Sequence, residues 1–304
     1  PVRVFAEDVG FEIHAVARFA LAQGSHFVGV RDDPDAATAR QQGNLKLDGV
    51  PEVPAELAAR ALQYSNARPL RLVGWLPDGR GLLVATRFGE TNQIHHVAAP
   101  LGTRSQWTFG AEPVAFAAPR PLPTPLAAPQ GDAGAELILG LDKGGSEFYQ
   151  LFHFRRADGA MALLTDGKSR HEGPQWSRDG KQLAFVGTGR NGKDFDVYVW
   201  QPGADLAAPP PPKLVKELAG SWRVTDWSFD GTKLLVLHYL SIEHAEVFEL
   251  TLATGDLRPI QADKAGKPAA YGTARYGEGG AIWVTTGVDA EFQRLVRIGA
   301  DGAS

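Results

Sequence analysis

The stretch GPQWSRDGKQLAFVG, from Gly173 to Gly187, places an aromatic residue, a Ser-x-Asp-Gly turn and an apolar run within fifteen positions. Fifty-one residues further on, VTDWSFDGTKLLVLH, from Val224 to His238, has the same pattern. Regular self-similarity over 20 to 50 residues is typical of repeat architectures, so the rest of the chain must be searched for further copies.

Two sets of positions recur along the chain. The aromatic residue before the turn is found at Trp75, Trp176, Trp227 and Tyr276, with spacings of 101, 51 and 49, so one intervening copy is degenerate. A second strand-like stretch follows each apolar run, and its second residues are 57, 46, 50 and 48 positions apart. These residues are Ile94, Leu151, Val197, Val247 and Leu295. The offset between the two sets stays between 19 and 21 residues, which one motif repeated by chance would not produce.

Each repeat can be divided into four short strands. Asp-Gly favours a tight hairpin turn after the aromatic residue. Continuous apolar runs such as QLAFVGTG and KLLVLHYL predict second strands that are buried on both faces. Four antiparallel strands in every 46 to 57 residues predict an all-β protein, a β-propeller of four-stranded blades. A β-sandwich is the alternative, but it does not require a regular four-strand period.

Five blades are recognisable, and we expect them to form part of a seven- or eight-bladed ring. Their predicted bounds are 70–112, 113–167, 173–218, 224–262 and 273–304. The last has no fourth strand, so the propeller, assigned to 53–304, is expected to be truncated. A helix is predicted from Val53 to Ser65, with Pro54 at its first position, and residues 1–52 are interpreted as an arm or an incomplete blade.

Two proline-rich segments interrupt the pattern. The segment from Pro119 to Ala135 stands where the first hairpin of the second blade should be, and proline cannot occupy a central strand. Pro209 to Pro212 extends another loop. We interpret both as solvated loops in preference to recognition tracts.

Composition excludes several classes of protein. The net charge of -4 gives no basic surface for nucleic acid or an anionic membrane, and no apolar run is long enough to span a bilayer. The absence of cysteine rules out disulfides, thiolate nucleophiles and cysteine-ligated metals, and it leaves the compartment unassigned. The stretch Ala15–Gln23 matches a signal peptide poorly, because Glu7 and Asp8 precede it where a basic region is expected. No cofactor motif occurs.

Catalytic motifs are also lacking. Gly144-Gly145-Ser146-Glu147-Phe148 has no final glycine and leads into a strand, so it fails as a nucleophile elbow. His95 and His96 point to opposite faces of one strand, while His238 and His244 flank one loop and form a weak metal-site candidate. Acidic residues recur beside the third strands, where they could bind a cation or a substrate amine or act as a glycosidase pair, although a solvated rim is the simpler interpretation. They are Glu90, Glu147, Asp194, Asp196, Glu243, Glu246 and Glu291.

The repeats resemble blades from the propeller domain of prolyl oligopeptidase-family serine peptidases, including the dipeptidyl-peptidase and acylaminoacyl-peptidase branches. WLPDGRGLLVATRFGETNQIHHV, GGSEFYQLFHF, LLTDGKSRHEGPQWSRDG and WSFDGTKLLVL carry this likeness, as does LQYSNARPLRLVGW before the first blade. Similar motifs occur in TolB-type propellers. The likeness extends from about Val53 to Gly302 and implies a propeller that restricts access to a Ser-Asp-His site in a following α/β-hydrolase domain. That domain is not within these residues, so no catalytic residue can be assigned, although Arg87 and Glu90 are candidates for the access face.

Three functions follow as hypotheses. The first is the non-catalytic propeller portion of a prolyl oligopeptidase-like peptidase, which gates access and selects peptide substrates for the hydrolase domain. The second is a free-standing TolB-like propeller that binds a protein partner. The third is a propeller hydrolase that uses clustered carboxylates, with Glu90 and Glu147 as its first candidates.

Overall fold

The computed structural model describes residues 3–6, 40–42, 45–48, 50–121, 134–203, 205–260 and 268–299. Its contacts divide the chain into two compact units. The first contains Pro1–Arg68 with Gly144–Ser146, and the second contains Pro69–Lys143 with Glu147–Ser304.

The first unit contains a small sheet and the predicted helix. Strands β1 (Arg3–Ala6), β3 (Leu45–Asp48) and β2 (Arg40–Gln42) pair antiparallel in the order β1-β3-β2. The helix, α2, is confirmed and extends from Ala55 to Ser65, directly after Pro54. None of its residues is buried, so the apolar face expected along it is exposed.

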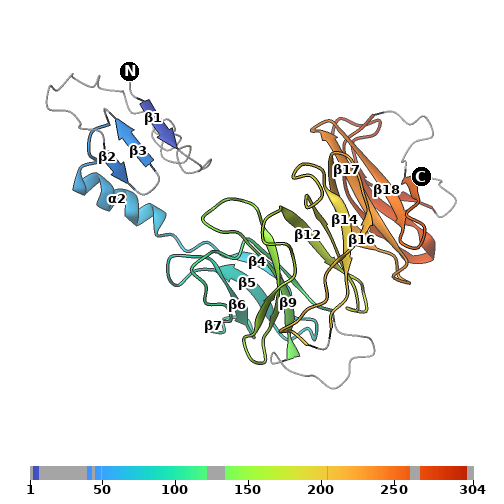
Figure 1. Cartoon of the computed structure of the whole chain (residues 1–304), viewed down its shortest axis with the longest axis horizontal. Helices are drawn as coiled ribbons and strands as arrows, with labels where there is room; N and C mark the ends of the chain where they lie inside the picture. Colours follow the sequence, from blue (N-terminus) through green and yellow to red (C-terminus); the bar gives the residue numbers. More distant parts are fainter. Residues whose placement is uncertain are drawn as a thin grey trace. The chain divides into compact units, whose positions relative to one another are not determined.

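The second unit contains five antiparallel sheets that follow one another along the chain (Figure 1). Each sheet keeps its strands in chain order, which confirms the β-propeller fold. Blade 1 contains β4 (Arg71–Trp75), β5 (Leu82–Thr86), β6 (Gln93–Val97) and β7 (Arg104–Gln106). Blade 2 contains β8 (Phe116–Pro119), β9 (Glu136–Leu141), β10 (Gln150–Arg155) and β11 (Met161–Leu163).

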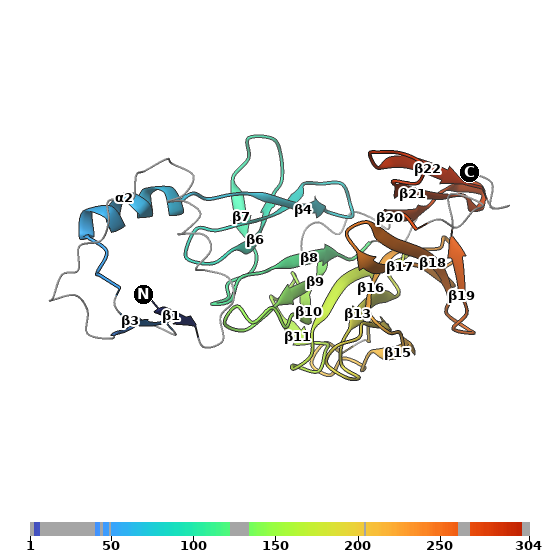
Figure 2. The ribbon, with the colours of Figure 1, turned by 90° about the horizontal axis from the view of Figure 1, so that it is seen from above.

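Blade 3 contains β12 (His171–Trp176), β13 (Leu183–Gly187), β14 (Asp196–Trp200) and β15 (Lys213–Lys216). Blade 4 contains β16 (Ser221–Trp227), β17 (Lys233–Ser241), β18 (His244–Thr251) and β19 (Leu257–Ile260). Blade 5 contains β20 (Tyr271–Tyr276), β21 (Ile282–Thr286) and β22 (Arg294–Ile298) (Figure 2). A short 3-10 turn at Glu278–Gly280 lies between β20 and β21. Within the described residues this sheet has three strands, and residues 300–304 lie outside them.

Apolar side chains join each blade to the next. Among the described residues they form four buried clusters, and each cluster takes its members from two consecutive blades. Leu183 and Phe185 of β13 pack toward blade 2, whereas Ala184 and Val186 pack toward blade 4. Because side chains alternate along a strand, a second strand between two blades must be apolar at every position. This explains the continuous apolar runs in the sequence.

The repeated tryptophans tie each blade to the one before it. The Trp176 indole N–H donates to the Ala118 carbonyl of β8 at 3.2 Å, and that of Trp227 donates to the Gln175 carbonyl of β12 at 2.8 Å. Tyr276 in blade 5 donates its hydroxyl to Glu249 Oε2 of blade 4 at 3.0 Å. The aromatic residue before the turn therefore forms a hydrogen bond to the preceding blade in blades 3, 4 and 5.

Blade 2 begins before its proline-rich segment. The missing first strand is β8, which pairs with β9 and ends at Pro119. The sequence pattern hides this strand because it carries Ala117 and Ala118 in place of an aromatic residue and an Asp-Gly turn. Residues 122–133, which contain most of the proline-rich segment, lie outside the described residues.

The outer faces of blades 1 and 5 are apolar and exposed. Trp75 stands at the repeat position of Trp227, yet it is 64% exposed while Trp227 is 1% exposed. Leu72 on the same strand is also exposed. In blade 5, Ile282 and Val284 are buried against blade 4, whereas Trp283 between them is 39% exposed.

Candidate functional site

The serine of the repeated turn has a structural role. Ser177 Oγ donates to Asp179 Oδ1 at 2.7 Å and accepts the Gln182 N–H at 2.9 Å, and Ser228 and Asp230 repeat the first bond at 2.6 Å. The glycine that follows the aspartate has a positive φ, 67° at Gly180. Because the Ser177 hydroxyl donates its proton to Asp179 and accepts the Gln182 N–H, both bonds serve the turn and none of its described partners is a general base for nucleophilic attack.

The recurring acidic residues are distributed over all five blades. We call the connections between second and third strands the 2–3 loops; they are residues 87–92, 142–149, 188–195, 242–243 and 287–293. Glu90, Glu147, Asp194, Glu243 and Glu291 occupy one loop each. No three histidine or acidic side chains of the described residues come close enough together to hold a metal ion. The carboxylate cluster, which was the alternative to a solvated rim, therefore does not assemble as a metal site in this part of the chain.

Two of these acidic residues hold blade 3 together. Asp196 is fully buried and accepts the Arg190 Nε–H at 2.8 Å and the Leu218 N–H at 2.9 Å. Asp194 accepts the Gly220 N–H at 2.8 Å, and this bond is the main reason that its pKa is lowered. Both carboxylates fasten a 2–3 loop to the start of the next blade, which is a structural role.

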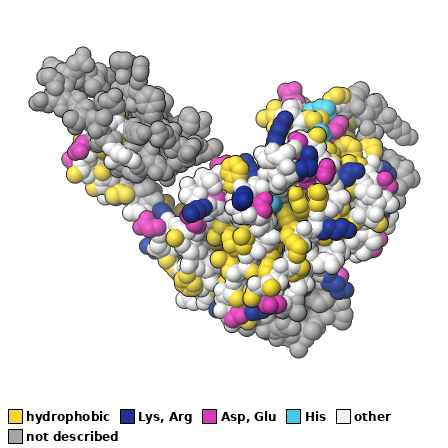
Figure 3. All heavy atoms as spheres, viewed as in Figure 1, with side chains coloured by type: hydrophobic (Ala, Val, Ile, Leu, Met, Phe, Trp, Pro, Cys, Tyr) yellow, Lys and Arg dark blue, Asp and Glu magenta, His cyan; other side chains and the backbone are white. Residues whose placement is uncertain are grey.

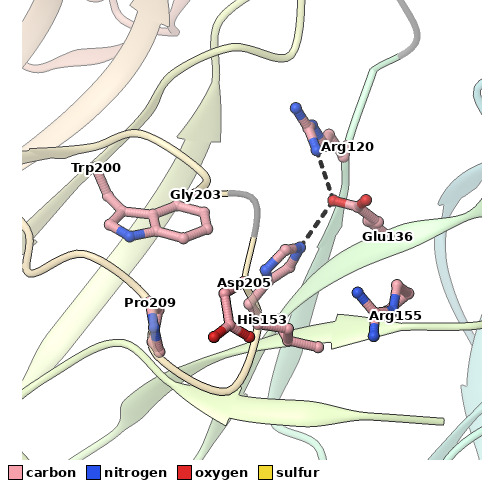
Figure 4. A pocket seen from close by; sticks show the side chains of 9 residues that line it. Arg120, Glu136, His153, Arg155, Trp200, Gly203, Asp205 and Pro209 are labelled. Atoms are coloured by element: carbon pink, nitrogen blue, oxygen red, sulfur yellow. Dashed lines mark hydrogen bonds and ion pairs between the residues drawn. The ribbon is translucent and has the colours of Figure 1, made fainter. Parts of the chain in front are cut away.

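A charged pocket lies between blades 2 and 3 (Figure 4). Glu136 Oε2 accepts from Arg120 Nη1 at 2.6 Å and lies 2.8 Å from His153 Nε2, so one carboxylate oxygen bonds to both side chains. The hydrogen bond from His153 is the main reason that the pKa of Glu136 falls to about 2, and Arg120 adds to the shift. Trp200 and the loop through Asp205 and Pro209 form the opposite wall.

The size of this pocket limits what it can do. Its volume of about 70 Å³ is well below the roughly 300 Å³ at which small-molecule sites begin. Arg120 also donates to the Gly180 carbonyl of blade 3 at 2.8 Å and lies over the Trp176 ring. The group therefore clamps two blades together.

A larger, open cleft of about 480 Å³ lies between the first strands β8 and β12. First strands line the centre of a propeller, so this cleft faces the position of the channel. Phe116 and Tyr149 form one wall, with their rings 5.5 Å apart, and Glu172 and Pro174 form the other. Its volume suits a small ligand or the side chains of a peptide.

The polar groups of the cleft are Tyr149 and Glu172. Burial raises the pKa of the Tyr149 hydroxyl, and the carboxylates of Asp142 and Glu147 add to the rise. Arg170 Nε donates to Glu172 Oε1. Gly173 has a φ of 62°, and the pairing of β12 with β13 shifts register between Glu172 and Gln175. A bulge of this kind re-aims side chains and often stands beside a binding site.

No sequence pattern marks this cleft. Glu172 and Tyr149 lie within the family-like phrases, but no spacing marks them as a pair, because one belongs to β12 and the other to the loop before β10. The degenerate first strand of blade 2 concealed the position of Phe116. The one available signal in the sequence was the pair Gly173-Pro174, since proline within a strand favours a bulge.

None of the described histidines is among the residues that line the cleft, although the His171 N–H donates to the Tyr149 carbonyl at 3.0 Å. His95 and His171 are buried, and burial lowers the pKa of each. His238 stacks on Trp222 with the ring centroids 4.2 Å apart, and His238 and His244 both lie near Glu246, at 3.4 and 3.8 Å. Arg87 Nη1 donates to the Glu90 carbonyl at 3.5 Å, within the 2–3 loop of blade 1.

Comparison with solved structures identifies the class of fold as the β-propeller shared by TolB and prolyl oligopeptidase-type enzymes. A prolyl endopeptidase matches with a TM-score of 0.55 and 13% identity over 78% of this chain, and a puromycin hydrolase with 0.55 and 16% over 79%. TolB from Acinetobacter baumannii matches with a TM-score of 0.51 and 17% identity over 77%. No family model matches the sequence. No curated protein matches it either.

The chain spans only part of these proteins. The matches cover 35% of the prolyl endopeptidase, 38% of the puromycin hydrolase and 53% of TolB. In the described part of this chain, no helix has the length and apolar character needed to cross a membrane.

Proposed function

We propose that the chain is the non-catalytic propeller portion of a prolyl oligopeptidase-like serine peptidase, in which it gates access and selects peptides for an α/β-hydrolase domain. The observation that carries this proposal is the ordered set of family-like blade motifs, from Trp75 to Trp227, on a fold shared with a prolyl endopeptidase and a puromycin hydrolase. The proposal assigns the chemistry to residues outside this chain.

The exposed apolar faces of blades 1 and 5 support a propeller that contains more blades than these five. Trp176 and Trp227 each donate to the preceding blade, while Trp75, at the same repeat position, is exposed. Burying a side chain of this size is worth several kcal/mol, of the order of 2 to 3. We therefore propose that further blades cover Leu72 and Trp75 at one end and Trp283 at the other.

The cleft between β8 and β12 supports the selection of peptides. Aromatic and proline walls with two polar groups are the usual lining of a site for a small ligand or a peptide side chain. In the proposed peptidase, this cleft contacts a peptide on its way through the propeller toward the hydrolase domain.

The reading frame beyond Ser304 tests the proposal. We expect it to encode roughly two further blades, as a ring of seven or so requires, and then a Gly-x-Ser-x-Gly elbow before a helix. The longer protein should cleave peptides, and Tyr149→Ala or Glu172→Gln should raise KM for them more than it lowers kcat. A stop codon directly after Ser304 would contradict the proposal.

A free-standing TolB-like propeller is the second candidate, and the match to TolB from Acinetobacter baumannii favours it. This candidate requires the reading frame to encode the remaining blades of a closed propeller and then to end without a hydrolase domain. A purified, stoichiometric complex between that complete propeller and a defined protein partner would support it over the peptidase.

A further inference from the structure

The cleft between β8 and β12 has a lining that limits the chemistry of its ligand. Of the described residues that line it, Glu172 is the one with a charge at neutral pH, and no lysine, arginine or histidine is among them. Most of the remaining wall is apolar and comes from Phe116, Ala117, Ala118 and Pro174. A single carboxylate in an apolar cleft fixes the orientation of a ligand that carries the opposite charge.

The charges around the cleft are also mainly negative. Figure 3 shows acidic and basic side chains close together over the surface, so one carboxylate does not by itself mark a site for a cation. Burial raises the pKa of the Tyr149 hydroxyl, three carboxylates raise it further, and one guanidinium lowers it. These groups belong to Asp142, Glu147, Glu172 and Arg170. Three negative charges therefore reach this hydroxyl against one positive charge.

Glu172 has room for a second partner. Its Oε1 accepts from Arg170 Nε, and the described residues supply no hydrogen bond to its Oε2. The Glu172 side chain is 35% exposed, so a ligand can reach it. Because an ionised carboxylate has about four lone-pair sites, Glu172 can accept from a ligand and keep its bond to Arg170.

The aromatic wall suits a cation that is carried on an apolar stem. The rings of Phe116 and Tyr149 are 5.5 Å apart at an angle of 68°, and both residues are partly exposed. A Cβ at Gly140 would collide with the Phe116 ring, so this glycine allows the ring to lie against β9. Aromatic faces attract ammonium and guanidinium groups, and they also pack against methylene groups.

Hydrogen bonds hold the wall around Tyr149 in place. The backbone N–H of His171 donates to the Tyr149 carbonyl at 3.0 Å, which joins the loop before β10 to the start of β12. The side-chain amide of Gln150 donates to the Ser169 carbonyl at 2.6 Å. A wall that is ordered before binding lowers the entropy that a ligand must lose on entering the cleft.

These features favour one kind of peptide group. The side chains of lysine and arginine combine a positive charge with a stem of three or four methylene groups, which matches the carboxylate and the apolar wall together. The ammonium group of a peptide N-terminus has no such stem. A neutral apolar side chain would use the wall alone, and an acidic side chain would meet the repulsion of Glu172.

We propose that the cleft between β8 and β12 is a specificity subsite for the cationic side chain of a lysine or arginine. Glu172 is its charge partner, and the rings of Phe116 and Tyr149 form its apolar wall. This inference rests on the proposed function and deepens it, because the peptides that the propeller selects then carry a basic residue where they reach this cleft.

Peptide binding to the 304-residue chain tests the inference directly. The probes are pentapeptides of alanine, acetylated and amidated at their ends, with arginine, lysine, citrulline or norleucine at the centre. Citrulline retains the shape of arginine without its charge. In calorimetric titrations we expect the arginine and lysine peptides to bind about tenfold more tightly than the two neutral peptides. The difference should shrink as the salt concentration rises, since salt screens an exposed charge pair.

Matched variants assign the preference to the cleft. Glu172→Gln keeps the size of the side chain and should bring the arginine peptide down to the affinity of the citrulline peptide. Glu278→Gln makes the same change at an exposed turn of blade 5 and should leave the preference intact. Phe116→Leu should weaken the arginine and lysine peptides by about threefold or more, because the aromatic face is lost.

Three results would overturn the subsite. They are equal binding of the arginine and citrulline peptides, including no binding of either, a preference that survives Glu172→Gln, and tight binding of a norleucine peptide whose N-terminus is left free. The last result would assign the cleft to a terminal ammonium group. None of these titrations needs a hydrolase domain, so a reading frame without one would refute the proposed function and leave the preference of the cleft to be measured independently.

Discussion

Asp226, on the first strand of blade 4, bonds to the blades on both sides. Its Oδ2 accepts from Arg178 of blade 3 at 3.0 Å and from the Tyr276 N–H of blade 5 at 2.8 Å, and its Oδ1 lies 3.4 Å from Arg275 Nη1. The carboxylate is buried, whereas both arginines are half exposed. One side chain thus links three consecutive blades.

We expect Asp226→Asn to lower the free energy of unfolding by roughly 1 to 3 kcal/mol, less than for a fully buried ion pair because water reaches the arginines. Lys181→Ala is the matched control, because its ion pair with Asp179 at 3.3 Å is exposed and should contribute less than about 1 kcal/mol. Urea denaturation of both variants checks this. Equal effects would show that the buried link has no special weight.

Glu136 makes the stability of the chain depend on pH. Its pKa in the folded chain, about 2, lies below its ordinary value of 4.5, so the unfolded chain binds the proton more readily. The stabilisation is complete above pH 4.5 and is lost as the pH falls toward 2. It amounts to at most about 3 kcal/mol.

Glu136→Gln should therefore lower stability at pH 7 and flatten the fall in unfolding free energy between pH 5 and pH 2. Glu278→Gln, at a turn in blade 5, serves as the control and should keep the wild-type slope. Denaturant titrations at four or five pH values measure both slopes. If the slope of unfolding free energy against pH were unchanged in Glu136→Gln, the pair with His153 would not lower the pKa of Glu136.

At the scale of the strand, two tryptophans at one repeat position give a matched pair of variants. Trp227→Phe removes the indole N–H that donates to Gln175 and leaves a gap in a fully packed site, so it should cost roughly 2 to 3 kcal/mol. Trp75→Phe changes an exposed ring and should cost less than about 0.5 kcal/mol. Thermal and urea unfolding distinguish the two; similar losses would mean that Trp75 is covered in solution.

The strands with a strong repeat were predictable from sequence, and the reason is physical. A second strand between two blades needs apolar residues at every buried position, which produces the continuous runs Leu183–Gly187 in β13 and Leu234–Leu237 in β17. The strand β8 was not predictable, because alanines suffice where the Trp176 ring packs against its backbone. The helix α2 was found from Pro54 and Glu56, although its predicted apolar face is not buried.

The candidate sites were less accessible to sequence reasoning than the strands. The acidic residues of the 2–3 loops were identified by their spacing, but their neighbours Ile242 and Phe292 were not recognised as exposed, because apolar residues next to a strand are ordinarily part of it. The cleft that contains Tyr149 and Glu172 lies between β8 and β12, and the sequence does not indicate that these two strands are neighbours. Both cases require the positions of the blades in space.

At the scale of the whole molecule, we predict that the 304-residue chain has no serine that reacts as a peptidase nucleophile. Ser177 and Ser228 are occupied within turns, and Ser146 belongs to a hairpin loop that follows β9. We expect a fluorophosphonate probe to leave the 304-residue chain unlabelled, while the longer protein is labelled at its elbow serine. Labelling of the shorter chain, mapped to a peptide by mass spectrometry, would place a reactive serine within the propeller.

The four clusters between blades carry a consequence for how the molecule comes apart. Since every cluster of described residues belongs to two blades, no blade has a core of its own within that part of the chain, and the stability of each blade depends on its nearest neighbours. Blades 2, 3 and 4 have a neighbour on each side, whereas blades 1 and 5 have one. Fraying should therefore begin at the ends and move inward, with amide hydrogens of β22 exchanging well before those of β13.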